Sequence, residues 1–186
     1  KLAKDIFSKE ILIFDYIFNL FDEYKFSSSI FTDKSVQNFL WIGIIKIFFP
    51  NSKIILTDRN SRDVCLSIFK INFKNGFMNF AYDQKEIVEF YNTYENLVSF
   101  WKNLFKNEIY TVKYENLIED PENEIKNMID FCDLAWDENC LKHHKNKSAI
   151  KTASINQARN PIYKTSKNLS DNYQKQLGLM FGLLKK

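Results

Sequence analysis

Glycine is scarce in this chain: only four of its 186 residues are glycines, Gly43, Gly76, Gly178 and Gly182. A loop that cradles phosphate with its backbone N–H groups needs closely spaced glycines, as in the G-x-x-x-x-G-K-[ST] pattern. The chain has no such stretch, and it also lacks the H-E-x-x-H pattern of zinc proteases and the G-x-S-x-G pattern of serine hydrolases. The sequence therefore excludes a glycine-rich phosphate loop and these two hydrolase sites within itself.

Cysteine and histidine are also few. The three cysteines, Cys65, Cys132 and Cys140, show no C-x-x-C spacing, so we expect reduced thiols rather than a zinc site or a disulfide framework. The two histidines, His143 and His144, are adjacent, and adjacent residues do not share one face of a helix. Their spacing argues against a metal site or a catalytic triad.

Long apolar runs and a strong net charge are also missing. A membrane-spanning helix needs about 18 or more apolar residues, whereas the longest apolar run, NFLWIGIIKIFF, is interrupted by Lys46 and ends at Pro50. We expect no membrane span in this chain and a cytoplasmic location. No signal peptide is visible, but a chain that starts at Lys1 does not decide targeting. The net charge of +3 is too weak to indicate a nucleic-acid-binding protein, but it is compatible with an anionic ligand.

Hydrophobic residues are abundant: they make up 45% of the chain and include 18 phenylalanines, which predicts a packed core in a single domain. The spacing of apolar residues switches between the periods of helices and strands. It predicts helices over residues 2–24 (one long helix, or two short ones broken near Ser8), 36–48, 62–72, 84–105, 121–132 and 171–184, and a helical turn at YENL. Strands are predicted over residues 30–31, 53–58 and 109–113, and loops through KNGFMNFAYDQ and residues 143–168. The predicted N-caps are Asn60, Asp83, Asp120 and Ser170. Strands separated by helices indicate an α/β fold with a parallel sheet.

Arginine is much rarer than lysine, since only Arg59, Arg62 and Arg159 are arginines among 26 Lys and Arg. Arg59 directly follows the strand predicted over residues 53–58, and ligands bind at the carboxyl ends of strands in open α/β sheets. The planar guanidinium group binds phosphate or carboxylate through two parallel hydrogen bonds. Arg59 is therefore a candidate phosphate-binding residue. The alternatives are that the scarcity of arginine is compositional drift, or that Arg62 and Asp63 form a surface pair.

Other polar residues are predicted at the same edge of the sheet, because parallel strands point one way. Lys34 follows the first predicted strand and is a candidate for neutralising charge on a transferred group, with a solvated lysine as the alternative. Ser67 is either a hydrogen-bond donor to a phosphate oxygen or an ordinary helix serine. Tyr114 either stacks on a base or lies at the edge of the core. The late segment KTASINQARNPIYKTSK is a donor-rich loop or a plain polar loop, and its candidate donors are Ser154, Gln157, Arg159 and Tyr163.

Three segments in order, FTDKSVQNFLWIGIIKIFFPNSKIILTDRNSRDVCLSIF, VKYENLIEDPENEIKNMIDFCDLAW and KTASINQARNPIYKTS, resemble the carboxyl-terminal two-thirds of a PAPS-dependent sulfotransferase. The chain is most similar to bacterial tetratricopeptide-linked sulfotransferases and to tyrosylprotein sulfotransferases, over Ile30 to Tyr173. The resemblance implies an α/β fold like that of P-loop NTPases, a parallel sheet flanked by helices. It also implies sulfuryl transfer from PAPS to a hydroxyl of a protein tyrosine, a carbohydrate or a small molecule, without a metal.

The resemblance assigns roles residue by residue. Arg59 and Ser67 match the pair that binds the 3′-phosphate of PAPS, and Tyr114 matches the tyrosine beside the adenine. Lys34 matches the lysine that contacts the transferring sulfuryl group, and Ser154 matches a serine with the same task. The late loop that closes over the nucleotide is matched at Ser154, Gln157, Arg159 and Pro161.

The chain departs from the family pattern at its amino-terminal side. The phosphosulfate loop, an Arg-Ser-Gly-Thr-type turn after the first strand, is absent, as is the glutamate that serves as the base in the tyrosylprotein branch. Val36 stands where cytosolic sulfotransferases have a histidine. Three strands are few for an open sheet, and the chain starts at Lys1 rather than at methionine. We therefore expect residues 1–186 to be the carboxyl-terminal part of a single sulfotransferase domain, inactive alone, with the first strand and tetratricopeptide repeats as candidates upstream.

Two other functions stay open from the residues. One is a non-catalytic nucleotide-binding or scaffold domain that keeps the fold and has lost the phosphosulfate loop. The other is a relative of the P-loop kinases that uses ATP. The Arg59–Ser67 pair and the late loop argue against it, because they indicate a 3′-phosphate. The sequence upstream of Lys1 and the choice between PAP and ATP separate these three functions.

Overall fold

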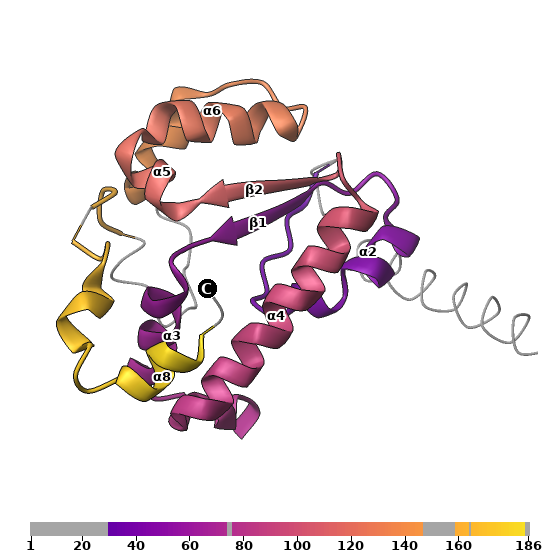
Figure 1. Ribbon diagram of the computed structural model, residues 1–186. Coiled ribbons are helices and arrows are strands. Elements are labelled where there is room, and N and C mark those ends of the chain that lie inside the picture. The colour runs from indigo at the N-terminus through magenta and orange to yellow at the C-terminus, as the bar shows by residue number, and fades with distance from the viewer. Residues whose placement is uncertain (1–29, 74–75, 147–158, 164, 185–186) are drawn as a thin grey trace, which may run out of the picture. The chain divides into compact units, whose positions relative to one another are not determined.

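The computed structural model describes residues 30–73, 76–146, 159–163 and 165–184 (Figure 1). The chain divides into two compact units, Lys1–Asn51 and Ser52–Lys186. The helix predicted over residues 2–24 lies outside the described residues.

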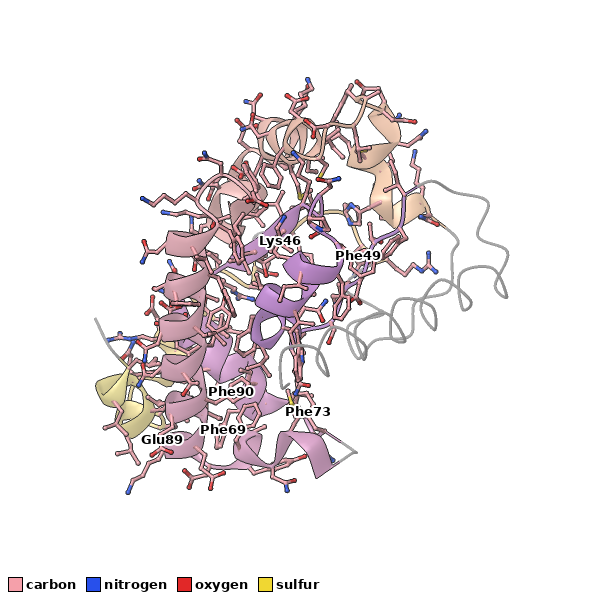
Figure 2. All side chains as sticks on the ribbon, turned by 90° about the vertical axis from the view of Figure 1, so that its right-hand side faces the viewer. Lys46, Phe49, Phe69, Phe73, Glu89 and Phe90 are labelled. Carbon is pink, nitrogen blue, oxygen red and sulfur yellow. The ribbon has the colours of Figure 1, made fainter. Side chains whose placement is uncertain are left out.

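The described part of the first unit holds a short 3-10 helix, η1 (Asn38–Leu40), and the helix α2 (Ile42–Phe48). They confirm the helix predicted over residues 36–48 except at its start and at Trp41, which separates the two elements. The helix α2 is not buried on all sides, because Ile42 is buried while Ile44 and Ile47 are exposed. Lys46, labelled in Figure 2, is buried and donates from Nζ to the carbonyl oxygen of Pro50 at 2.6 Å.

The strand predicted at Ile30 and Phe31 is wrong, since both residues lie in irregular backbone. A strand needs a ladder of hydrogen bonds to a neighbour, and two apolar residues supply few of them. Phe31 instead packs edge-on against Phe49, with ring centroids 5.7 Å apart.

The second unit is built on two parallel strands, β1 (Ile54–Asp58) and β2 (Ile109–Lys113), which confirm two of the predicted strands. Their register pairs Ile54 with Ile109 and Asp58 with Lys113. Two helices, α3 (Ser61–Lys70) and α4 (Gln84–Leu104), form the long connection that parallel neighbours require. Figure 1 shows these helices on one side of the strand pair and α5 and α6 on the other. The predicted α/β character with parallel pairing is therefore present in a helix-rich unit.

The N-caps of three helices confirm the sequence predictions. The side chain of Asn60 accepts the backbone N–H groups of residues 62 and 63 at the start of α3, and Asp83 accepts those of residues 85 and 86 at the start of α4. Asp120 caps α6 (Pro121–Phe131), whose first residue is the proline expected there. The predicted turn at YENL is the short helix α5 (Tyr114–Glu119).

The remaining elements differ from prediction. The segment predicted as a loop through KNGFMNFAYDQ contains the 3-10 helix η2 (Gly76–Tyr82), and residues Glu138–Lys145 form another, η3. The helix predicted over residues 171–184 with Ser170 as its cap is wrong. The chain forms a 3-10 helix, η4 (Leu169–Tyr173), and then a separate helix, α8 (Gly178–Leu183). Ser170 lies inside η4 because its backbone N–H is bonded to Asp63 on α3.

The apolar core of this unit lies among α3, α4 and α8. Its buried members are Cys65, Leu66, Ile87, Val88, Leu177, Met180, Phe181 and Leu184. Burial raises the pKa of the Cys65 thiol to about 12, so the thiol is neutral at physiological pH. Aromatic rings extend the packing at one end of α4, where Figure 2 labels Phe69 and Phe90, and the rings of Phe80 and Phe90 stack with centroids 4.0 Å apart.

Candidate functional site

The carboxyl ends of β1 and β2 bring Arg59 and Tyr114 together. Asp58 and Lys113 are register partners at the ends of the two strands, so the next residue of each strand lies at the same edge. The guanidinium carbon of Arg59 lies 4.5 Å from the ring centroid of Tyr114, which is a cation–π contact. The predicted meeting of these two residues at one edge is therefore present in the structure.

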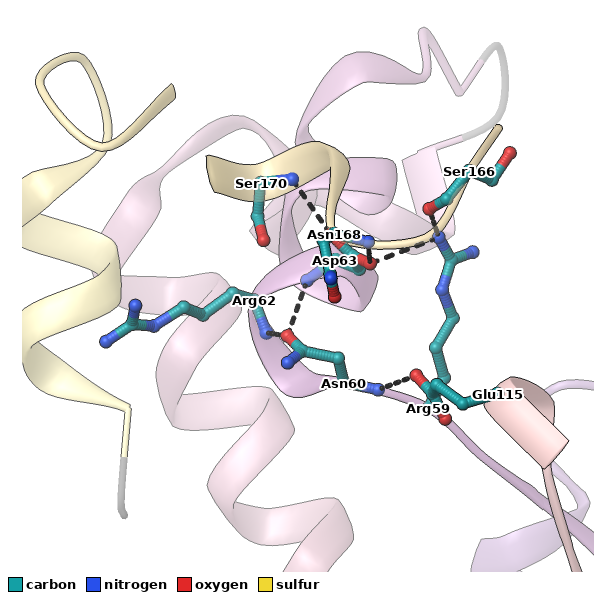
Figure 3. A network of polar contacts seen from close by, with 8 residues as sticks. All are labelled: Arg59, Asn60, Arg62, Asp63, Glu115, Ser166, Asn168 and Ser170. Atoms are coloured by element: carbon teal, nitrogen blue, oxygen red, sulfur yellow. Dashed lines mark hydrogen bonds and ion pairs between the residues drawn. The ribbon is translucent and has the colours of Figure 1, made fainter. Parts of the chain in front are cut away.

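Asp63 holds Arg59 in this position. The carboxylate of Asp63 is buried, and its Oδ2 atom lies 3.5 Å from Nη2 of Arg59. The same carboxylate accepts the backbone N–H of Asn168 at 2.9 Å and that of Ser170 at 2.8 Å (Figure 3). A buried charge is costly unless it is paired and hydrogen-bonded, and Asp63 has both kinds of partner.

The alternative of a surface pair between Arg62 and Asp63 is wrong. The guanidinium group of Arg62 lies 5.6 Å from the ring centroid of Phe181, and Asp63 is buried beside Arg59 instead. Arg62 and Asp63 are adjacent on α3, and adjacent residues do not face each other on a helix.

Arg59 has further contacts that fix its direction. Its Nη2 also donates to the carbonyl oxygen of Ser166, and its Nε is buried with no hydrogen-bond partner among the described residues. The side chain is partly exposed. Arg59 is therefore oriented by Tyr114, Asp63 and Ser166 while its guanidinium group keeps donor capacity.

Two more contacts fasten the surrounding segments. The backbone N–H of Asn60 donates to Oε1 of Glu115 at 3.0 Å, which ties the turn after β1 to the start of α5. Nζ of Lys167 lies 2.8 Å from Oε1 of Glu119 at the end of α5. The turn after β1, α5 and residues 166–170 thus form one polar network, which we call the rim network.

The structure places the remaining predicted residues as follows. Ser67 lies on α3, four residues after Asp63, with an exposed side chain, and Arg159 is half-buried. Lys34 is exposed and belongs to the first unit. Ser154 and Gln157 lie outside the described residues. The structure brings Arg59 and Tyr114 together, and the roles of all seven residues stay predictions.

Sequence reasoning missed Asp63, Glu115 and Ser166 as members of the network. Helical periodicity does not connect Arg59 with Asp63, because Arg59 precedes Asn60, the N-cap of α3. The partners of Asp63 in residues 168 and 170 lie more than one hundred positions away along the chain, and no local pattern indicates them.

A polar hollow of about 400 Å³ adjoins Arg59, between the end of β1 and α4. Its lining residues are Asp58, Arg59, Ser61, Tyr91, Asn92, Glu95, Asn96 and Ser99. Burial, and next the charge of Glu95, raise the pKa of the Tyr91 hydroxyl above its usual range, so Tyr91 is neutral and Glu95 brings negative charge to the hollow. The surface beside the rim network thus carries both signs of charge.

The described ranges also bear on metal sites and membrane-spanning helices. In residues 30–73, 76–146, 159–163 and 165–184, no three His, Cys, Asp or Glu side chains are grouped in a way that would hold a metal ion. No helix within the part of the chain that the structure describes has both the length and the apolar character that crossing a membrane requires.

Comparison with known proteins gives one family. The profile described as "Sulfotransferase family" matches residues 3–138, well over half of the chain. An uncharacterized protein of Aquifex aeolicus (strain VF5) is 39% identical over 147 residues, which are 78% of this chain and 19% of that protein.

Two further relatives carry the name "Putative protein-tyrosine sulfotransferase". The protein of Caenorhabditis briggsae is 30% identical over 113 residues, 61% of this chain and 40% of that protein. That of Caenorhabditis elegans is 28% identical over 111 residues, 60% of this chain and 42% of that protein. The chain thus spans less than half the length of each of these relatives.

Proposed function

The chain belongs to the sulfotransferase family, and from that premise we propose that it binds the 3′-phosphate and adenine of PAPS in a protein that transfers a sulfuryl group to an acceptor hydroxyl. The observation that carries this proposal is the stacking of Arg59 on Tyr114 at the carboxyl ends of two adjacent parallel strands. Ligands of open α/β sheets bind at that edge. The same proposal includes a complete sheet of the P-loop NTPase type, of which β1 and β2 are two strands.

The donor set at the rim network suits a phosphate group. A guanidinium group binds phosphate as a planar fork, and Arg59 has a buried Nε without a partner among the described residues. In the proposal, Arg59 and the hydroxyl of Ser67 hold the 3′-phosphate, and Tyr114 lies beside the adenine. Ser154, Gln157 and Arg159 bind the same nucleotide from the late segment.

The proposed chemistry resembles phosphoryl transfer, in which the protein contributes positioning and charge stabilisation rather than covalent bonds. PAPS supplies an activated sulfuryl group when it is bound. Arg59 and Ser67 would hold a phosphate that is remote from the reacting atoms, so their binding energy would serve to orient the donor. Lys34 and Ser154 would stabilise the negative charge that develops on the leaving oxygen.

The acceptor class is a hydroxyl group, of a protein tyrosine, a carbohydrate or a small molecule. The names of the two Caenorhabditis relatives make peptide tyrosine the first acceptor to test. Upstream tetratricopeptide repeats are a candidate partner domain, which would bind such an acceptor and present it to the site.

The test is the contribution of the 3′-phosphate to binding in the full-length protein. Calorimetric titration gives the dissociation constants of PAP and of adenosine 5′-monophosphate (AMP), which differ only in that phosphate. We expect Arg59→Ala to reduce the preference for PAP over AMP by about 10- to 100-fold, since hydrogen bonds to charged groups contribute about 1.5–3 kcal/mol. Arg59→Lys should recover only part of the preference, because lysine keeps the charge and loses the fork.

Arg62→Ala is the matched control, because Arg62 is an arginine three positions away that packs over Phe181 and lies outside the rim network. It should leave the preference for PAP unchanged. A wild-type protein that binds both nucleotides equally, or prefers ATP to PAP, would contradict the proposal. PAP binding without sulfuryl transfer to any hydroxyl acceptor would support the non-catalytic nucleotide-binding domain.

A further inference from the structure

We propose that Asp63 is a positioning residue for the donor site, which orients Arg59 and couples it to residues 166–170. The inference rests on the proposed function of Arg59. It assigns to a buried carboxylate a role in discriminating the 3′-phosphate, in addition to its contribution to folding.

The geometry makes Asp63 the centre of the rim network. Its side chain is 1% exposed, and its two oxygens accept backbone N–H groups from Asn168 and Ser170. These two bonds hold the carboxylate in one direction. The oxygen that accepts from Asn168 is also the one that lies 3.5 Å from Nη2 of Arg59 (Figure 3).

Electrostatics explain why Asp63, Arg59 and residues 166–170 depend on one another. A buried carboxylate needs an opposite charge, and Arg59 is the cation placed beside it. In return, Asp63 and the carbonyl oxygen of Ser166 hold the guanidinium group against the Tyr114 ring. Without Asp63, the long side chain of Arg59 would populate several rotamers. Binding a phosphate would then cost the conformational entropy of ordering that side chain.

The contacts also connect ligand binding to residues 166–170. Nη2 of Arg59 is shared between Asp63 and Ser166, so a phosphate that engages this nitrogen changes the balance of both contacts. Coupling between two sites is reciprocal. Ligand at Arg59 should therefore alter the protection of the amides of Asn168 and Ser170, which donate to the same carboxylate.

The experiment compares Asp63→Asn with Glu119→Gln in the full-length protein. Asparagine keeps the shape of aspartate but removes the charge, and it turns an N–H group toward donors. We expect Asp63→Asn to reduce the preference for PAP over AMP by about tenfold. Glu119→Gln is the control, because it removes the ion pair between Glu119 and Lys167, which also holds residues 166–170 and does not include Arg59. It should leave the preference unchanged.

A double-mutant cycle separates positioning from general destabilisation. In an Arg59→Ala background, Asp63→Asn should produce no further loss of the preference for PAP, because Asp63 acts on that preference by orienting Arg59. An equal loss in both backgrounds, or no loss in either, overturns the inference. If Arg59→Ala itself has no effect on the preference, the proposed function fails; if only Asp63→Asn has none, the proposed function stands and the inference fails.

Amide hydrogen exchange of the wild-type protein gives a second measurement that needs no variant. PAP should slow exchange in the peptide covering residues 166–170 by several-fold more than AMP at equal saturation. Equal slowing by both nucleotides would overturn the coupling even if Asp63→Asn failed to fold.

Discussion

Two regions that begin two residues apart on α3 are built in opposite ways. Asp63 faces the rim network, where each contact joins a particular donor to a particular acceptor. Cys65 faces the apolar core with α4 and α8, where contacts are made by carbon and sulfur surfaces without direction. The comparison shows that one ten-residue helix serves both stability and a candidate site, and that different physics governs its two sides.

The difference predicts how each region responds to mutation. Apolar burial contributes in proportion to area, and the core tolerates changes that conserve volume. A polar network contributes less net stability but leaves costly unpaired groups when one member is lost. Core variants should therefore change stability alone, and variants of Arg59 and Asp63 should change nucleotide preference.

The largest effect should come from Met180→Ala in the core. Met180 is 0% exposed, and truncating a buried methionine to alanine costs about 2–5 kcal/mol through lost burial and the cavity left behind. Thermal or denaturant unfolding of the full-length protein measures the loss. Leu179→Ala is the matched control on the same helix, since Leu179 is 53% exposed and should change stability by less than about 0.5 kcal/mol. A changed preference for PAP in folded Met180→Ala would contradict the claim that the core affects stability but not nucleotide preference.

A smaller effect, on rate alone, is expected from Lys34→Ala. If Lys34 stabilises charge in the transition state, its loss should lower kcat of the full-length protein by about 100-fold. The PAP dissociation constant should change little, in contrast to Arg59→Ala. Lys113→Ala, at an exposed lysine, is the control. Unchanged turnover in Lys34→Ala would remove Lys34 from the proposed site.

The smallest effect should come from the cap that borders both regions. Asn60→Ala removes the acceptor for two backbone N–H groups at the start of α3 and should cost about 1 kcal/mol of unfolding free energy. Asn60→Gly should cost only a few tenths of a kcal/mol. Both variants keep the backbone N–H that donates to Glu115, so neither should alter the PAP preference. A large loss of preference would show that the cap, rather than Asp63, sets the position of Arg59.

The sequence predicted what depends on neighbours along the chain. The strands around Leu56 and Val112 follow from short apolar runs, and the caps at Asn60, Asp83 and Asp120 follow from side chains that reach two or three residues ahead. The meeting of Arg59 and Tyr114 also followed, because parallel strands end at one edge.

The sequence could not predict what depends on distant partners. Ser170 has the side chain of an N-cap, and so a helix was predicted after it, but its backbone N–H bonds to Asp63 across more than one hundred positions. Two arginines shortly precede Asp63 in the sequence, at positions 59 and 62, and only the structure shows which one it pairs with. Polar contacts of this kind are set by tertiary structure, and hydrophobic periodicity does not record them.

The most direct test of the central claim is a structure of the full-length protein with PAP. We predict that an oxygen of the 3′-phosphate lies within about 2.7–3.2 Å of a guanidinium nitrogen of Arg59, with the adenine beside Tyr114. A 3′-phosphate bound elsewhere, with Arg59 still engaged only by Asp63 and Ser166, would contradict the account.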